Sequence, residues 1–171
     1  MIIVIIGQSA SGKTSYAKKN FIDGELTLKD KPVKHTICNN TLLIGHYGIG
    51  RRCEGSDTPG LNQIQPIIDL IKDNEDKFNT IVAEGDRINN NRFFEFLKGK
   101  DVKVILFECS LETSMKRLKK EGSNIQEQFV KTTQTKSLNN FRLAQKLGFQ
   151  TERINTDDTP TGLGRFLKCV V

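Results

Sequence analysis

The chain alternates short apolar runs with longer stretches in which apolar residues recur at helical spacing. The runs 2–6, 80–83, 102–107 and 149–154 each have the length of a buried strand. The clearest helical pattern follows Thr58-Pro59, a pair typical of a helix start, and predicts a helix from about 59 to 77. Strands that alternate with helices predict a mostly parallel sheet with helices on both faces.

The other segments complete this picture. Helices are predicted over 13–21, around 93–97, over 111–121 with Ser110 as its cap, over 125–147 with an interruption rich in Thr, Ser and Asn, and over about 160–167. The β-prone runs 33–38 and 42–47 flank Asn39-Asn40-Thr41 and predict a β-hairpin, an insertion in the parallel sheet. We expect 21–34 to be a polar connection and 48–58 a loop.

The segment from Gly7 to Thr14 matches the phosphate-loop pattern G-x-x-x-x-G-K-[ST] at every fixed position. It directly follows the first apolar run and opens the first predicted helix, which is the context in which such a loop binds phosphates. The ammonium of Lys13 then reaches the β- and γ-phosphates, and the Thr14 hydroxyl binds Mg²⁺. The residues predicted to bind the nucleotide are Gly7, Ser9, Ala10, Ser11, Gly12, Lys13, Thr14 and Ser15. ATP and Mg²⁺ are the expected cofactors.

Composition limits the number of domains and the cellular location that we expect. The 171 residues predict one domain, 1–171, and no stretch is long and apolar enough to span a bilayer. Four scattered cysteines form no C-x-x-C pair, which favours a reducing, cytoplasmic location without a zinc site. The net charge is +6, and the stretch from Leu111 to Lys146 holds eight basic and three acidic residues. We therefore expect a basic, lid-like helical region over about 111–147 that closes over the nucleotide or holds a polyanion.

Acidic residues follow the predicted strands at the edge where ligands bind in parallel sheets. Glu84 is placed to bind the metal, and either Asp57 or Asp86 is placed to orient the acceptor hydroxyl; the sequence does not rank these two. Arg117 is expected to act in catalysis, at the phosphates or the nucleobase. Acceptor contacts are predicted for Asp57, Arg87, Lys131 and Lys136.

A GTPase is the main alternative from another class, because Asp57 to Gly60 spells the D-x-x-G sequence that senses a γ-phosphate. However, a charged stretch precedes this Asp instead of a buried strand, and no N-K-x-D guanine-reading sequence follows. These features favour ATP and a kinase.

Four segments, GQSASGKT, EGSDTPG, IVAEGDRI and FVKTTQTKSLNN, together resemble those of small P-loop kinases of bacteriophages, in particular the 5-hydroxymethyluracil DNA kinases. The resemblance implies a P-loop nucleotide-kinase-like α/β/α fold and transfer of a γ-phosphate to a hydroxymethyl group on a base in DNA. Thr58-Pro59 stands where a basic residue is expected in that family. Aromatic residues that can stack on a base are scarce, with Tyr47, Phe93 and Phe94 as the candidates. A kinase of free nucleosides or nucleotides is the alternative within enzymes.

Overall fold

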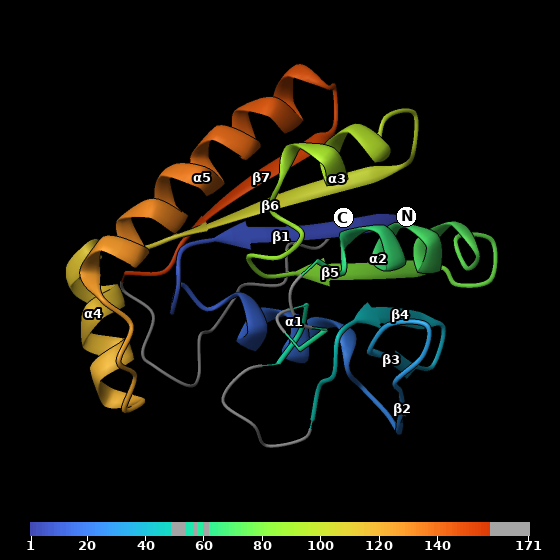
Figure 1. Ribbon diagram of the computed structural model, residues 1–171, viewed down its shortest axis with the longest axis horizontal. Helices are drawn as coiled ribbons and strands as arrows, with labels where there is room; N and C mark the ends of the chain where they lie inside the picture. Colours follow the sequence, from blue (N-terminus) through green and yellow to red (C-terminus); the bar gives the residue numbers. More distant parts are fainter. Residues whose placement is uncertain (49–53, 57, 60–61, 158–171) are drawn as a thin grey trace.

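The computed structural model describes residues 1–48, 54–56, 58, 59 and 62–157 and contains a seven-stranded sheet in the order β2-β3-β4-β5-β1-β6-β7 (Figure 1). The strands are β1 (Ile2–Gly7), β2 (Leu26–Lys29), β3 (His35–Cys38), β4 (Thr41–Ile44), β5 (Thr80–Glu84), β6 (Val102–Glu108) and β7 (Gln150–Asn155). Strands β4, β5, β1, β6 and β7 pair in parallel, whereas β2, β3 and β4 form antiparallel pairs. The predicted mostly parallel sheet with a hairpin insertion is confirmed.

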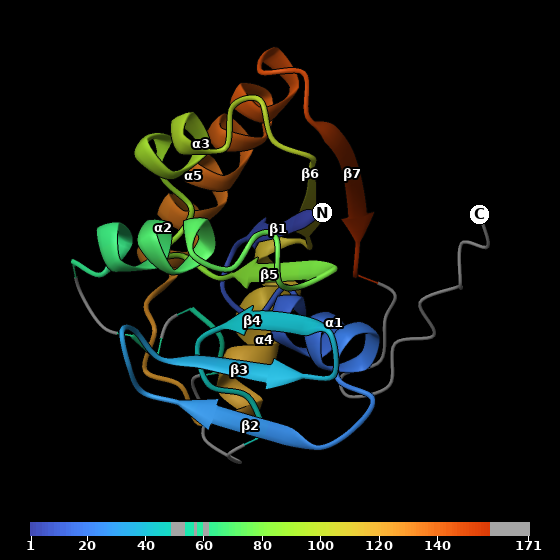
Figure 2. The same ribbon diagram turned by 90° about the vertical axis from the view of Figure 1, so that its right-hand side faces the viewer.

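The helices α1 (Lys13–Phe21), α2 (Ile64–Lys72), α3 (Asn91–Phe96), α4 (Leu111–Lys120) and α5 (Glu127–Lys146) complete the fold. All six residues of β1 are buried, because the strand lies between β5 and β6 and is covered on both faces. Its Ile2, Val4 and Ile6 belong to a core with α2, α3 and α5, while Ile3 and Ile5 pack with Ala17 of α1. The result is the predicted three-layer α/β/α arrangement, visible in the turned view of Figure 2.

Two elements near the hairpin differ from the prediction. The polar connection 21–34 contains strand β2, which extends the sheet through its pairing with β3. Helix α2 begins at Ile64, not at Pro59, and ends at Lys72. Thr58 does not cap it: the Thr58 hydroxyl donates to the Gly55 carbonyl (2.8 Å) and accepts from the His46 amide (2.9 Å). The hydroxyl therefore ties the loop to the end of β4.

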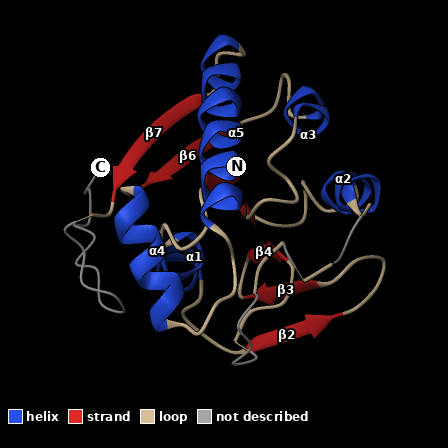
Figure 3. Ribbon diagram, turned by 60° about the vertical axis from the view of Figure 1, so that its left-hand side comes forward, coloured by secondary structure: helices blue, strands red, loops and turns tan. Residues whose placement is uncertain are grey.

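Helix α5 runs without the predicted interruption. Its hydroxyl side chains bond to carbonyls of the preceding helical turn, including Thr132 to Gln128 (2.9 Å), Thr133 to Val130 (3.0 Å) and Ser137 to Thr133 (2.7 Å). Such bonds satisfy the polar groups without ending a helix. The helix packs over β1, β6 and β7 as part of one layer (Figure 3).

Several predictions hold or lie outside the described residues. The Ser110 side chain accepts from the Thr113 amide (3.1 Å) and caps α4, as predicted. The predicted closing helix, 160–167, lies outside the described residues. Among the described helices, none combines the length and the apolar character needed to cross a membrane.

Candidate active site

The phosphate loop connects two elements that fix its ends. Strand β1 ends at Gly7, and α1 begins at Lys13 after Gly12, which has a left-handed φ of 96°. Ala10 is left-handed as well, with a φ of 55°. Left-handed residues that alternate with right-handed ones turn successive amides toward one concave surface, the geometry that binds anions. The loop therefore has the conformation of a phosphate cradle.

Side chains from α4 and from the residue after β7 hold the loop by its carbonyl groups. The Ser114 hydroxyl donates to the Ser9 carbonyl, Arg117 Nη1 to that of Ala10 (3.1 Å), and Thr156 Oγ1 to that of Ser11 (3.0 Å). Buried groups bound in this way keep one conformation, because breaking each bond would leave an unsatisfied carbonyl. The cradle is thus built in advance of any ligand.

The ammonium of Lys13 lies over the start of the loop. Its Nζ donates to the carbonyls of Gly7 (3.0 Å) and Gln8 (2.7 Å). A lysine held at this position places a positive charge beside any anion in the cradle. The contact of Lys13 with phosphates stays a prediction.

Thr14 and Glu84 meet beside the loop. Thr14 Oγ1 donates to Glu84 Oε1 at 2.9 Å, because β5 lies next to β1 and brings its last residue to the first turn of α1. Glu84 is only 2% exposed, and the Ser56 amide donates to its carbonyl (3.0 Å). A hydroxyl and a carboxylate are oxygen donors of the kind Mg²⁺ prefers, so these two residues fit the predicted metal.

No group of three or more His, Cys, Asp or Glu side chains lies close enough to hold a metal within the part of the chain that the structure describes.

Asp86 lies two residues beyond Glu84, at the mouth of a small pocket. Its Oδ1 is 2.9 Å from Lys136 Nζ, and both side chains are about one-third exposed. The pocket holds about 250 Å³ and is lined by Asn62, Gln63, Ile64, Ile67, Asp86, Arg87, Asn90 and Lys136. Three predicted acceptor-side residues, Asp86, Arg87 and Lys136, are therefore brought together.

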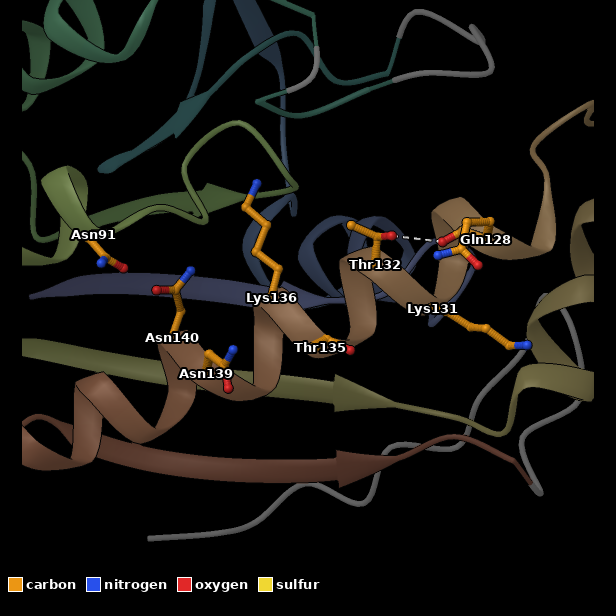
Figure 4. A pocket seen from close by; sticks show the side chains of 8 residues that line it. All are labelled: Asn91, Gln128, Lys131, Thr132, Thr135, Lys136, Asn139 and Asn140. Carbon is orange, nitrogen blue, oxygen red and sulfur yellow. Dashed lines mark hydrogen bonds between the residues drawn. The ribbon is translucent and has the colours of Figure 1, made fainter.

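A second, more open groove of about 580 Å³ runs along α5 and shares Lys136 with this pocket. Figure 4 shows its lining side chains: Asn91, Gln128, Lys131, Thr132, Thr135, Lys136, Asn139 and Asn140. Lys131 points away from Lys136 and pairs with Glu127 (2.6 Å) one turn earlier. The predicted acceptor contacts Lys131 and Lys136 thus belong to one groove, at different places along it.

Arg117 is 8% exposed and bonds Ala10 of the loop and the hydroxyl and carbonyl of Thr156. These contacts place it at the back of the phosphate loop, where its charge acts on the cradle. Its predicted direct contact with nucleotide stays a prediction. Asp57, the other candidate to orient the acceptor, lies outside the described residues.

The aromatic candidates for base stacking are all core residues. Tyr47, Phe93 and Phe94 have 0% exposure, since they pack in the two hydrophobic layers that cover the sheet. None of these three rings can therefore serve as a stacking platform in this conformation.

Sequence reasoning missed Glu54, which is 6% exposed and pairs through Oε2 with Lys18 Nζ at 2.8 Å. Lys18 stands one helical turn after Thr14, so α1 is joined to two buried carboxylates on one side. An acid in a predicted loop carries no sequence signal of burial. Two residues that support the phosphate loop, Ser114 and Thr156, were weakly indicated by the sequence, because both follow the ends of parallel strands.

Two titratable groups beside the loop are perturbed. Burial raises the pKa of the Cys109 thiol, although the nearby charge of Arg117 opposes the effect. The Ser110 amide, which donates to the Asp157 carboxylate, lowers the pKa of that group. At neutral pH the thiol is thus uncharged and the carboxylate ionised.

Comparisons with known proteins give a likeness of fold. The chain is similar to the deoxyadenosine kinase of M. mycoides in three structures: with bound dCTP, with the products dCMP and a flexible dCDP, and with bound dATP. The sequence identities are 14%, 14% and 13%, and the TM-scores are 0.45, 0.48 and 0.42, in the same order. The matches cover 94%, 90% and 94% of this chain and 92%, 90% and 93% of those chains. No protein-family model and no curated protein sequence matches the chain. Since all three TM-scores lie below 0.5, the function proposed below rests on the residues of this chain.

A Gly7→Ala variant is expected to lose folding stability. Gly7 has a φ of 151°, and a Cβ there would lie 2.2 Å from the Phe107 carbonyl oxygen, a backbone atom of the neighbouring strand. Relieving this clash requires β1 and β6 to separate, and we expect a loss of about 2–4 kcal/mol in the free energy of unfolding. Urea unfolding followed by circular dichroism measures it. Gly99→Ala is the control, because Gly99 is also left-handed but has open space around it. An equal loss in both variants would show that backbone strain alone is responsible.

Proposed function

We propose that the protein is an ATP- and Mg²⁺-dependent kinase that transfers the γ-phosphate to a hydroxyl group. The observation that carries this proposal is the phosphate loop with Thr14 Oγ1 at 2.9 Å from the buried carboxylate of Glu84. A cradle, a lysine and a pair of oxygen donors at one place are the parts that phosphoryl transfer requires.

The roles follow from position. The loop amides and Lys13 hold the β- and γ-phosphates. Thr14 and Glu84 would hold Mg²⁺, and the bound ion would neutralise phosphate charge. Asp86 accepts a hydrogen bond from the acceptor hydroxyl and orients its oxygen toward the γ-phosphate. Asp57 is the competing candidate for this role from the sequence, and it lies outside the described residues. Arg117 stabilises the loop that carries the phosphates.

The small pocket beside Asp86 supports a free nucleoside or nucleotide as the acceptor. Its volume of about 250 Å³ lies just below the roughly 300–1,000 Å³ typical of ligand pockets, so its size suits one small molecule. Ile64 and Ile67 supply apolar lining, while Gln63, Asn90 and Arg87 supply hydrogen-bonding groups. This combination suits a base and sugar better than an ion alone.

A hydroxymethylated base in DNA is the second candidate, and the groove along α5 supports it. The groove has Lys131 and Lys136 and six carboxamide or hydroxyl residues in its lining, without an acidic residue. Such a surface attracts a phosphate backbone. The burial of Tyr47, Phe93 and Phe94 weighs against this acceptor, because an extruded base is usually held between aromatic or apolar side chains.

The test is transfer of label from γ-labelled ATP with Mg²⁺ to three acceptors: free nucleosides, nucleoside monophosphates, and DNA that contains 5-hydroxymethyluracil. We expect label on a free nucleoside or nucleotide with little dependence on salt. Transfer to DNA that falls steeply from low to physiological salt would support the second candidate instead. Hydrolysis of GTP without label on any acceptor would contradict the kinase proposal and favour a nucleotide switch.

A further inference from the structure

The loop that carries Asp86 is attached to α5 at two points. At the first point, Lys136 Nζ donates both to the Asp86 carboxylate (2.9 Å) and to the Asp86 carbonyl (3.1 Å). A lysine that holds both the side chain and the backbone of one residue restricts the carboxylate as well as the chain beneath it. In Figure 4 the Lys136 side chain extends from α5 toward this loop.

The second point is a buried chain of polar side chains. Asn140 Nδ2 donates to Asn89 Oδ1 (2.8 Å), and Asn89 Nδ2 donates to Ser137 Oγ (3.0 Å). The three residues are only 1–5% exposed. Buried amides without partners are costly, so the chain favours one relative position of the loop and the helix.

The two points act on the same short stretch. The Asn89 amide donates to the Asp86 carbonyl (3.2 Å), which closes a turn between them, and Ile88 between them is fully buried in the core. Asn140 stands three positions after Ser137 and four after Lys136, and residues at these two spacings are neighbours on a helix surface. A movement of the loop would therefore break both attachments.

We propose that Lys136, Asn140 and Asn89 are positioning residues that set the direction of the Asp86 carboxylate toward the acceptor. This inference rests on the proposed function, because it takes Asp86 as the group that orients the acceptor hydroxyl. It adds that α5, instead of acting only as a lid or a surface for the acceptor, determines the catalytic geometry. A displacement of about 1 Å in such a group costs up to about 100-fold in rate.

The first test compares turnover and binding in Lys136→Met and Asn140→Ala. We expect kcat to fall about 10-fold to 100-fold in Lys136→Met and about 3-fold to 10-fold in Asn140→Ala, with KM for ATP within about twofold of wild type. Lys136→Arg keeps a cation and is expected to restore most of the rate. Lys146→Met is the matched control, an exposed lysine in the last turn of the same helix. In an Asp86→Asn background with residual activity, neither variant is expected to reduce kcat further.

The second test does not depend on activity. Hydrogen exchange of the peptide 84–92 is expected to become at least about 5-fold faster in both variants, while the phosphate-loop peptide 7–14 exchanges as in wild type. Thermal unfolding identifies a variant that has simply lost its fold, and Lys136→Met, at a position about one-third exposed, is expected to fold normally.

The outcomes separate the two proposals. Unchanged kcat in Lys136→Met and Asn140→Ala, or effects that add fully to those of Asp86→Asn, would overturn the positioning role. If wild-type protein transfers no phosphate to any acceptor, the kinase proposal fails, and unchanged exchange of 84–92 in both variants would then overturn the attachment as well. Faster exchange of 84–92 in the variants of a protein without kinase activity would support the attachment of the Asp86 loop to α5 but not the kinase proposal.

Discussion

A Lys13→Ala variant is expected to lose at least about 100-fold in kcat for phosphoryl transfer and to bind ATP weakly. The Lys13 ammonium lies at the start of the phosphate loop, 2.7–3.0 Å from two of its carbonyls, where it is directed at charge that develops on the transferred group. Removing a single preorganised donor of this kind costs about 10²–10³ in rate. The measurement is transfer of label from γ-labelled ATP, together with calorimetric titration of a non-hydrolysable ATP analogue.

Lys116→Ala is the matched control for this variant, because Lys116 is an exposed lysine on α4. Its activity is expected to stay within about twofold of wild type, since a single exposed charge contributes little. If Lys13→Ala retained more than a third of wild-type transfer, the phosphate loop would not be the site of the reaction.

A Glu84→Gln variant is expected to lose about 100-fold in kcat and to require at least about 10-fold more Mg²⁺ for half-maximal activity. Glutamine keeps the size of the side chain and an oxygen that accepts from Thr14, but it removes the negative charge that favours a divalent cation. Titration of transfer with MgCl₂ at saturating ATP measures the change.

The same substitution is expected to leave the folding stability without Mg²⁺ unchanged or higher. Glu84 is 2% exposed, and a buried carboxylate costs free energy that a neutral amide does not. Lower activity together with a higher thermal midpoint would show that Glu84 serves the reaction and not the stability of the fold. Glu112→Gln, an exposed acid in the first turn of α4, is the control. A lower midpoint with normal Mg²⁺ dependence would instead assign Glu84 a structural role.

The elements with strong periodic signals were predictable from the sequence. The central strands are continuous apolar runs because they are buried on both faces, and α1 begins directly after the phosphate-loop glycine. Strand β2 was not predictable, since none of the residues of its sequence LTLK is buried and the strand is held by backbone pairing with β3 at the sheet edge. The continuity of α5 was hidden by its Thr, Ser and Asn residues, whose partners are the preceding turn and Asn89.

The start of α2 shows a different limit of prediction from the sequence. Thr58-Pro59 has the local chemistry of a helix start, but the Thr58 hydroxyl bonds His46 and Gly55, far from the first residue of the helix. A hydroxyl next to a proline suits a cap or a tight loop equally well. Tertiary contacts with the end of β4 decide between them.

The phosphate loop, the parallel α/β/α layering and the acidic residue at the end of β5 could be predicted from the sequence alone, because each depends on local pattern and on the rule that parallel strands carry ligands at their carboxyl ends. Only the tertiary structure decided that Arg117 and Thr156 hold the loop from behind, that Glu54 is buried, and that Lys136 and Asn140 attach the Asp86 loop to α5. These hydrogen bonds join residues 50–145 positions apart along the chain. No local periodicity records such pairs, since they form only when the sheet order has placed the strand ends side by side.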